Sequence, residues 1–160
     1  MEICKMYAPD AFDRRLLHTL QRVPRQTLTE LAERVNLSPS QCSRRITRLE
    51  ENGIIQGHAL RLAPQALGLM VTAFITVSME KSRLEAPRET IASLLACDEV
   101  IDCHSTTGSH DFILKVKVAD LAELSHFLSS VVSPIPGVRD VATQVALECF
   151  KEAGPLKVMY

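Results

Sequence analysis

Residues 27–53, with the sequence TLTELAERVNLSPSQCSRRITRLEENG, predict two helices joined by a tight turn. The first helix opens with a capping box over Thr27–Glu30, in which a hydroxyl and a carboxylate each accept a hydrogen bond from the other residue's main-chain amide. A second capping box, over Ser38–Gln41, opens the second helix and has proline at its first helical position. Gly53 suits the left-handed end of that helix. Two helices of about ten and fourteen residues, separated in this way, are typical of a helix-turn-helix.

An earlier helix is predicted from about Pro9 to Val23, with Asp10 and Asp13 in its first turn. Apolar side chains recur at helical spacing in all three helices and predict one shared core. They are Phe12, Leu16, Leu20 and Val23 in the first helix, Leu28, Leu31, Ala32 and Val35 in the second, and Cys42, Ile46 and Leu49 in the third. Residues 54–62 follow the third helix, and we expect them to form a short pair of strands, a wing.

The outward face and start of the third helix carry the side chains that DNA reading requires. They are Ser38, Ser40, Gln41, Ser43, Arg44, Arg45, Thr47 and Arg48. Arginine can bind guanine with two hydrogen bonds, glutamine can bind adenine, and hydroxyls with a helix N-terminus can hold phosphate. Arg45 has a structural alternative, an ion pair with a carboxylate such as Asp13, because it lies at the edge of the inward face. Arg44 and Arg48, four residues apart, are therefore the stronger candidates for DNA contacts.

The charge is distributed unevenly between the two halves of the chain. The 160 residues have a net charge of −1, with 46% hydrophobic and 23% charged residues, which is a globular composition. Residues 1–62 have a charge balance of +3, and residues 63–160 have a balance of −4. A basic half joined to an acidic half suggests that one part meets a polyanion, although charge alone favours the alternative of two ordinary solvated surfaces.

The second half alternates strand, helix, strand, strand, helix and strand. The predicted elements are strands over 71–79, 100–107, 110–118 and 138–150 and helices over 87–97 and from 120 to about 131. Gly108-Ser109 is a two-residue hairpin signal between the middle strands. This order is the ferredoxin-like unit, so the fold class is α+β. Since helices cover one face of such a sheet, we expect a second copy of the chain to cover the other, through residues 71–150.

At this point the sequence resembles the Lrp/AsnC family of transcriptional regulators. The motifs that carry the resemblance are Asp10-x-x-Asp13-Arg14, residues 31–40, Arg44-Arg45, residues 48–55, residues 67–69, residues 102–104, Thr107-Gly108-x-x-Asp111, residues 136–138 and Thr143. The resemblance implies a winged helix-turn-helix for double-stranded DNA over 1–62 (helix-turn-helix about 28–47), a linker over 63–70 and a ligand-sensing, dimer-forming RAM domain over 71–160. It also implies further assembly, often as an octamer of four dimers around which DNA can wrap.

The resemblance also implies an amino-acid effector held between sensing domains of neighbouring subunits by main-chain groups of the hairpin loop. The positions it assigns here are Ser105, Thr107, Gly108, Ser109, His110, Asp111, Leu121, Gln144, Val145 and Ala146. Asp111 could accept from an ammonium group or stabilise the turn. The family loop is commonly Gly-Asp-aromatic-Asp, whereas this chain has Ser109 and His110 in the middle. The departure indicates a different amino acid or no effector, and Gln144 slightly favours a polar effector side chain.

Other classes of function find less support in the sequence. We expect neither an enzyme nor a bound metal or cofactor, because the sequence has no phosphate loop, nucleophile elbow or metal-ligand spacing. An aromatic content of 4% argues against an RNA-stacking sheet. Scattered cysteines indicate reduced thiols in a cytoplasmic protein, and no apolar run is long enough for a membrane span. The remaining alternative is a stand-alone amino-acid-binding module that regulates an enzyme.

Overall fold

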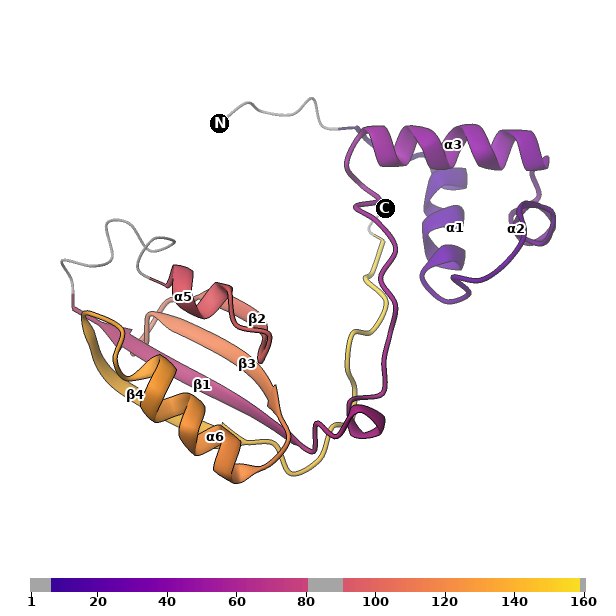
Figure 1. The fold of residues 1–160 in the computed structure, drawn as a ribbon. Helices are drawn as coiled ribbons and strands as arrows, with labels where there is room; N and C mark the ends of the chain where they lie inside the picture. Colours follow the sequence, from indigo (N-terminus) through magenta and orange to yellow (C-terminus); the bar gives the residue numbers. More distant parts are fainter. Residues whose placement is uncertain (1–6, 81–90, 159–160) are drawn as a thin grey trace. The chain divides into compact units, whose positions relative to one another are not determined.

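The computed structural model describes residues 7–80 and 91–158, which fall into two compact units (Figure 1). We call residues 1–60 with 151–160 the helical unit and residues 61–150 the sheet unit. The predicted α+β class is confirmed. Residues 151–160, which are predicted to belong to the second domain, group with the helical unit by their contacts.

Three helices build the helical unit: α1 (Ala11–Leu20), α2 (Leu28–Val35) and α3 (Pro39–Glu51). Both predicted capping boxes, at Thr27 and Ser38, are present. The helix α1 is shorter than predicted at both ends. Asp10 is its N-cap and lies outside the first turn, because its carboxylate accepts from the main-chain amides of Phe12 and Asp13.

The core of the helical unit follows the predicted helical spacing at most positions, and the half-buried Val23, beyond the end of α1, is not part of it. Its buried members are Leu16, Leu31, Ala32, Val35 and Cys42, with Leu20, Leu37 and Ile46 packed against them. Phe12 and Leu28 were expected in this core, but their exposed fractions are 37% and 44%. Phe12 lies under the guanidinium groups of Arg15 and Arg45 instead, at 5.6 and 5.4 Å from its ring centre.

The pair of strands predicted over 54–62 does not form, because the structure assigns no strand to these described residues. Gly57, with a φ of 147°, lies in the middle of the segment, where glycine favours an irregular backbone. An isolated two-stranded hairpin is also marginal without a further strand or helix against it. The alternation of apolar residues was too short here to decide between strand and loop.

The C-terminal segment is bound to the end of α1. The side-chain amide of Gln21, the C-cap residue of α1, donates to the main-chain oxygen of Leu156 at 3.3 Å and accepts from its amide at 2.6 Å. Both main-chain groups of one residue are thus paired with one side chain, as they would be by a neighbouring strand. No local pattern predicts this contact, which joins residues 135 positions apart.

We expect Gln21→Ala to release the segment around Leu156. A net loss of about 1 kcal/mol for the hydrogen bond predicts amide exchange about fivefold faster at Leu156, measured by NMR. Gln56→Ala is the matched control, since Gln56 is an exposed glutamine of the same unit. Unchanged exchange at Leu156 in Gln21→Ala would contradict this contact.

The sheet unit contains four strands: β1 (Val71–Met79), β2 (Val100–Ser105), β3 (Phe112–Val118) and β4 (Val138–Val145). Their order in the sheet is β2-β3-β1-β4, and every neighbouring pair is antiparallel, as the ferredoxin-like prediction requires. The helices are α5 (Ala92–Leu95) and α6 (Leu121–Phe127), which continues as the π-helix η3 (Leu128–Val132). A short 3-10 helix, η1 (Pro64–Leu67), precedes β1. The predicted start of the first helix, at 87, lies outside the described residues.

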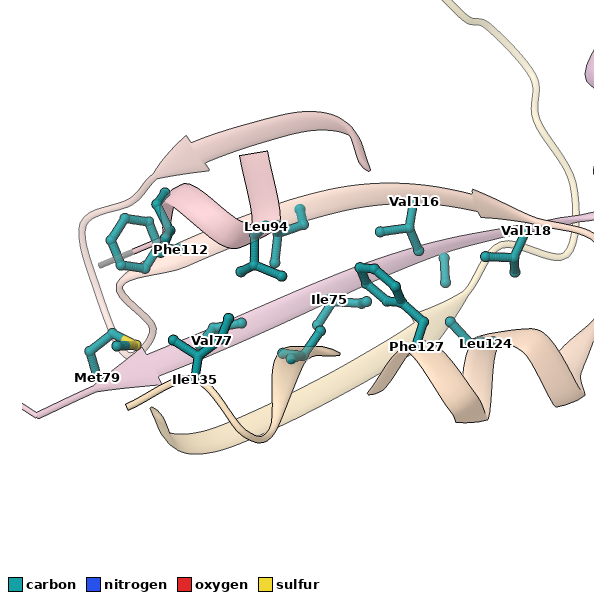
Figure 2. Packing of buried hydrophobic residues seen from close by; sticks show 14 residues of the cluster. Ile75, Val77, Met79, Leu94, Phe112, Val116, Val118, Leu124, Phe127 and Ile135 are labelled. Atoms are coloured by element: carbon teal, nitrogen blue, oxygen red, sulfur yellow. The ribbon is translucent and has the colours of Figure 1, made fainter. Parts of the chain in front are cut away.

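The buried core of the sheet unit lies on the face that the helices cover (Figure 2). Alternate residues of β1 and β3, such as Ile75 and Leu114, meet Leu94 of α5 and Phe127 of α6 there. The opposite face has a cross-strand row that no element of the described chain covers. The row runs Asp102, Lys115, Phe74 and Gln144 across β2, β3, β1 and β4.

Candidate functional site

The exposed side of α3 presents most of the side chains that the sequence assigned to DNA. Seven of the eight are exposed and Arg45 is half-buried; the exposed residues are Ser38, Ser40, Gln41, Ser43, Arg44, Thr47 and Arg48. A shallow depression on this side is lined by Arg44, Arg45, Thr47, Arg48 and Glu51. The spacing that buries Cys42 and Leu49 on the inner side turns these residues outward.

Ser38 and Gln41 are engaged in the cap of α3. The hydroxyl of Ser38 accepts from the Gln41 amide at 3.2 Å, and Gln41 Oε1 accepts from the Ser38 amide at 3.0 Å. Two-point binding of adenine by glutamine uses both the oxygen and the nitrogen of the side-chain amide. Because the cap occupies the oxygen, Gln41 can read adenine in that way only if the cap opens.

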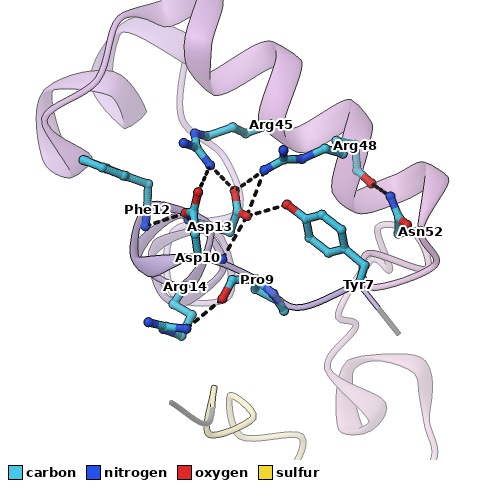
Figure 3. Close-up of polar contacts among 9 residues, drawn as sticks. All are labelled: Tyr7, Pro9, Asp10, Phe12, Asp13, Arg14, Arg45, Arg48 and Asn52. Carbon is cyan, nitrogen blue, oxygen red and sulfur yellow. Dashed lines mark hydrogen bonds and ion pairs between the residues drawn. The ribbon is translucent and has the colours of Figure 1, made fainter. Parts of the chain in front are cut away.

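Two aspartates at the start of α1 bind two arginines of α3 (Figure 3). Arg45 donates to Asp10 Oδ2 and to Asp13 Oδ1, both at 2.7 Å. Arg48 Nη2 donates to the carboxylate oxygens of Asp13 at 3.1 and 3.4 Å. The Tyr7 hydroxyl donates to Asp13 Oδ2 at 2.6 Å, and the Asp13 side chain is fully buried. We call these five residues the aspartate–arginine cluster.

Sequence reasoning found part of this cluster. The alternative that Arg45 pairs with Asp13 is confirmed. Arg48, favoured for DNA, also pairs with Asp13, and the remaining members Asp10 and Tyr7 were not foreseen. The spacing of Asp10 and Asp13 placed both at one helix start and could have indicated a joint site, but nothing in the sequence pointed to Tyr7.

The cluster favours ionised aspartates. Burial alone would raise the pKa of Asp13, but hydrogen bonds from Tyr7, Arg45 and the Asp10 amide outweigh it, and the pKa is lowered. The pKa of Asp10 is lowered in the same way, against its burial, by the Asp13 amide and Arg45. An aspartate in the unfolded chain has a pKa of about 3.9. The stability from ionised Asp13 is therefore complete above that pH and is lost as the pH falls through the lower folded-state pKa.

We expect Arg45→Ala to destabilise the helical unit strongly, because it removes one of the two cations from a buried carboxylate. The expected loss is about 3 kcal/mol in the free energy of unfolding, measured by urea denaturation at pH 7. Arg44→Ala, one residue away on the exposed side, is the control and should change this energy by less than about 0.5 kcal/mol. Equal stability of the two variants would remove the structural role assigned to Arg45.

The loop between β2 and β3, residues 106–111, is longer than predicted. The two-residue hairpin at Gly108-Ser109 is wrong, because β2 ends at Ser105 and β3 begins at Phe112. The loop is closed by the Thr106 amide, which donates to the Asp111 oxygen at 2.9 Å. Gly108 has a φ of 122°, which glycine adopts without strain.

Two side chains of this loop face the end of β1. Asp111 Oδ2 accepts from the Met79 amide at 2.7 Å, so the structure supports turn stabilisation for Asp111. His110 Nδ1 lies 3.1 Å from Ser78 Oγ, which engages the ring within the protein. The main-chain amides of 107–110 make no hydrogen bond to the part of the chain that the structure describes, and residues 107–109 are exposed.

The other predicted effector residues lie at the opposite end of the sheet. Gln144 and Val145 pair with Phe74 and Ala73, near the start of β1, and Ala146 follows them. Leu121 begins α6 directly after β3, whose last residue pairs with Val71. The loop 106–111, with Ser105 beside it, lies at the Met79 end, so about 20 Å of strand separates the two groups. One copy of the chain does not bring the ten residues together.

Three further observations concern metals, thiols and membranes. No group of three or more metal-ligating side chains occurs within residues 7–80 and 91–158. Cys103 and His104 pair with Leu114 and Ile113, so they point to opposite faces of the sheet, and burial raises the pKa of the Cys103 thiol. None of the helices in the described ranges is long and apolar enough to cross a membrane.

Comparison with known proteins covers both units. Residues 72–156 match the Lrp/AsnC ligand-binding domain, and residues 9–56 match a winged helix-turn-helix DNA-binding domain. The chain is 33% identical over 152 residues to the leucine-responsive regulatory protein of Haemophilus influenzae, covering 95% of this chain and 92% of that one. Its relative in Escherichia coli K12 is 31% identical over 149 residues, covering 93% and 91%.

Solved structures of regulators from the same family are similar to this chain in fold and sequence. A Neisseria meningitidis transcriptional regulator in complex with L-methionine has a TM-score of 0.88 and 35% identity, covering 94% of this chain and 97% of that one. The feast or famine regulatory protein of Mycobacterium tuberculosis, also complexed with L-methionine, has a TM-score of 0.82 and 32% identity, covering 91% and 97%. These proteins regulate transcription and are not enzymes. The chain belongs to the Lrp/AsnC family of DNA-binding transcriptional regulators.

Proposed function

We propose that this regulator reads double-stranded DNA with Ser40, Ser43, Arg44 and Thr47 of α3, and that Arg44 is the principal cation. The observation that supports this choice is that the other two arginines of α3 and Gln41 are engaged in the aspartate–arginine cluster and the helix cap. The Ser40 hydroxyl lies 3.0 Å from the Ser38 hydroxyl, a contact outside the buried cluster. Arg44 has no ion pair or side-chain hydrogen bond among the residues described, so its guanidinium is available to guanine or phosphate.

Arg44→Ala is expected to weaken binding to a duplex that the protein itself selects from random sequences. The loss of one base contact should cost about 1–3 kcal/mol and relax the preference at one position, whereas loss of a phosphate contact weakens all sequences alike. Fluorescence anisotropy on selected and scrambled duplexes separates these cases. Arg34→Ala, at an exposed arginine of α2, is the control. If Arg44→Ala binds the selected duplex as the wild type does, the assignment of the reading surface is wrong.

For the sheet unit we propose an effector site shared between copies of the chain. Unbonded amides of residues 107–110 suit the carboxylate of an amino acid, and the family match with its L-methionine complexes supports an amino acid as the class of ligand. Because Leu121 and Gln144–Ala146 lie at the far sheet end, a neighbouring copy is the source that brings such residues to the loop. His110, engaged with Ser78, then tunes the site without holding the ligand itself.

We further propose that the uncovered sheet face is where two copies meet. Phe74 is 37% exposed in the middle of that face, so a second copy of the chain can bury its ring. Further assembly to an octamer is consistent with the family.

We also propose that the protein acts in the cytoplasm. Chromosomal DNA as a partner and free thiols at Cys42 and Cys97 suit that compartment.

A thermal-shift screen with the twenty amino acids tests the effector site. A ligand at one hundred times its dissociation constant should stabilise the protein by about 2.7 kcal/mol. We expect Gly108→Val to abolish the shift, because a branched side chain does not adopt the φ of 122° that Gly108 has. His110→Gln should retain it and serves as the control within the same loop. Failure of every amino acid to stabilise the wild type would overturn the proposed sensor and leave the DNA-binding role intact.

A further inference from the structure

Two of the three arginines of α3 are neutralised from within the helical unit. Asp10 and Asp13 supply two negative charges, and Arg45 and Arg48 supply two positive charges, at contact distances of 2.7 to 3.1 Å. Only Arg44 keeps its charge uncompensated by an ion pair within the described residues. The basic character that the sequence suggests for this helix is thus largely cancelled at its surface.

The two neutralised arginines are held differently. Arg45 is bound by both aspartates, and its side chain is only 19% exposed, so it is part of the packing between α1 and α3. Arg48 is bound only by Asp13, at longer distances, and its side chain remains 45% exposed beside Arg44 and Thr47. Arg48 therefore lines the depression that we propose faces DNA, while its guanidinium is paired with the buried carboxylate of Asp13.

The surroundings of Asp13 stabilise its ion pair with Arg48. Its carboxylate is fully buried and accepts from the Tyr7 hydroxyl, the Asp10 amide and both arginines. The ring of Tyr7 lies under the Arg48 guanidinium, 4.9 Å away, and adds a cation–π contact. A buried carboxylate that lost a cation would be left with an uncompensated charge, which resists release of Arg48 to solvent or phosphate.

We propose that Asp13 is a specificity-determining positioning residue, which withholds the charge of Arg48 from DNA phosphates. The proposal rests on the α3 surface proposed above. Phosphate contacts supply essentially all non-specific affinity and carry no sequence information. Cancelling one arginine at the interface lowers non-specific binding, while Arg44 and the hydroxyls of Ser43 and Thr47 keep their access to bases. Asp13 acts through Arg48 and does not itself touch DNA.

The test is the salt dependence of binding to a scrambled duplex, measured by anisotropy on the full-length protein. Asp13→Asn is nearly isosteric and removes the charge. Arg45 retains Asp10, so Arg48 should be the arginine released. One additional phosphate contact should steepen the slope of log K against log salt by about 0.9 and raise non-specific affinity about fivefold at 0.15 M salt. The ratio of specific to non-specific affinity should fall.

Two controls identify the cause. Asp10→Asn also removes one charge and keeps a good N-cap, but Asp10 does not touch Arg48, so the slope should stay at the wild-type value. Adding Arg48→Ala to Asp13→Asn should return the slope to the wild-type value, which a merely destabilised helix would not do. A slope unchanged or shallower in Asp13→Asn would overturn the proposal.

A further comparison covers the case in which Asp13→Asn fails to fold. In the otherwise wild-type protein, Arg44→Ala should make the slope shallower by about 0.9, whereas Arg48→Ala should change it by less than half as much. Equal effects of the two arginines would overturn the role of Asp13 while leaving the α3 surface in place. Salt-independent or undetectable binding of the wild-type protein would instead overturn the proposed DNA interface, and this inference with it.

Discussion

The buried carboxylate of Asp13 is the constraint on which the helical unit depends. A charge in that position is tolerated only with full compensation, and four donors from three parts of the chain provide it. Satisfying Asp13 therefore fixes the start of α1, the residues before it and the middle of α3 in one arrangement. The angle at which α3 presents Arg44 follows from the ion pairs of its neighbours Arg45 and Arg48, so packing chemistry orients the surface that we propose reads DNA.

The sheet unit depends on a different constraint, the period of two along its strands. Alternation sends Ile75 and Leu114 to the helices and leaves Phe74 and Lys115 on a face without cover in one copy. The same geometry places the loop 106–111 and the Gln144–Ala146 segment at opposite ends of the sheet. In the function that we propose, a second copy of the chain covers the exposed sheet face and also supplies the missing residues of the effector site. Assembly and sensing are therefore linked by the topology of the sheet.

Sequence patterns predicted what is local and periodic. Two capping boxes and the strand β1 follow from spacing, and the sheet order agrees with the ferredoxin-like unit that the order of elements predicts. The family resemblance is confirmed over both domains. The errors fall where local signals are weak or compete with distant partners. Residues 54–62 alternate over too few positions to pair alone, and Gly108-Ser109 lies in a loop whose length is set by Asp111 binding β1. The hydrogen bonds between Gln21 and Leu156 join residues 135 positions apart, and no local sequence pattern predicts them.

Candidate site residues were harder to predict than the fold. A sequence shows which side chains are present but not which of them form hydrogen bonds or ion pairs within the folded chain. Ser38, Gln41, Arg45 and Arg48 belong by type to any list of DNA-reading residues, yet each has a structural partner in the folded chain. A side chain cannot satisfy a buried carboxylate or a helix cap and at the same time offer the same atoms to a base. In the function that we propose, the reading surface is therefore reduced to positions that neither hold the buried carboxylate nor cap the helix, and the helix contacts DNA with fewer charges than it contains.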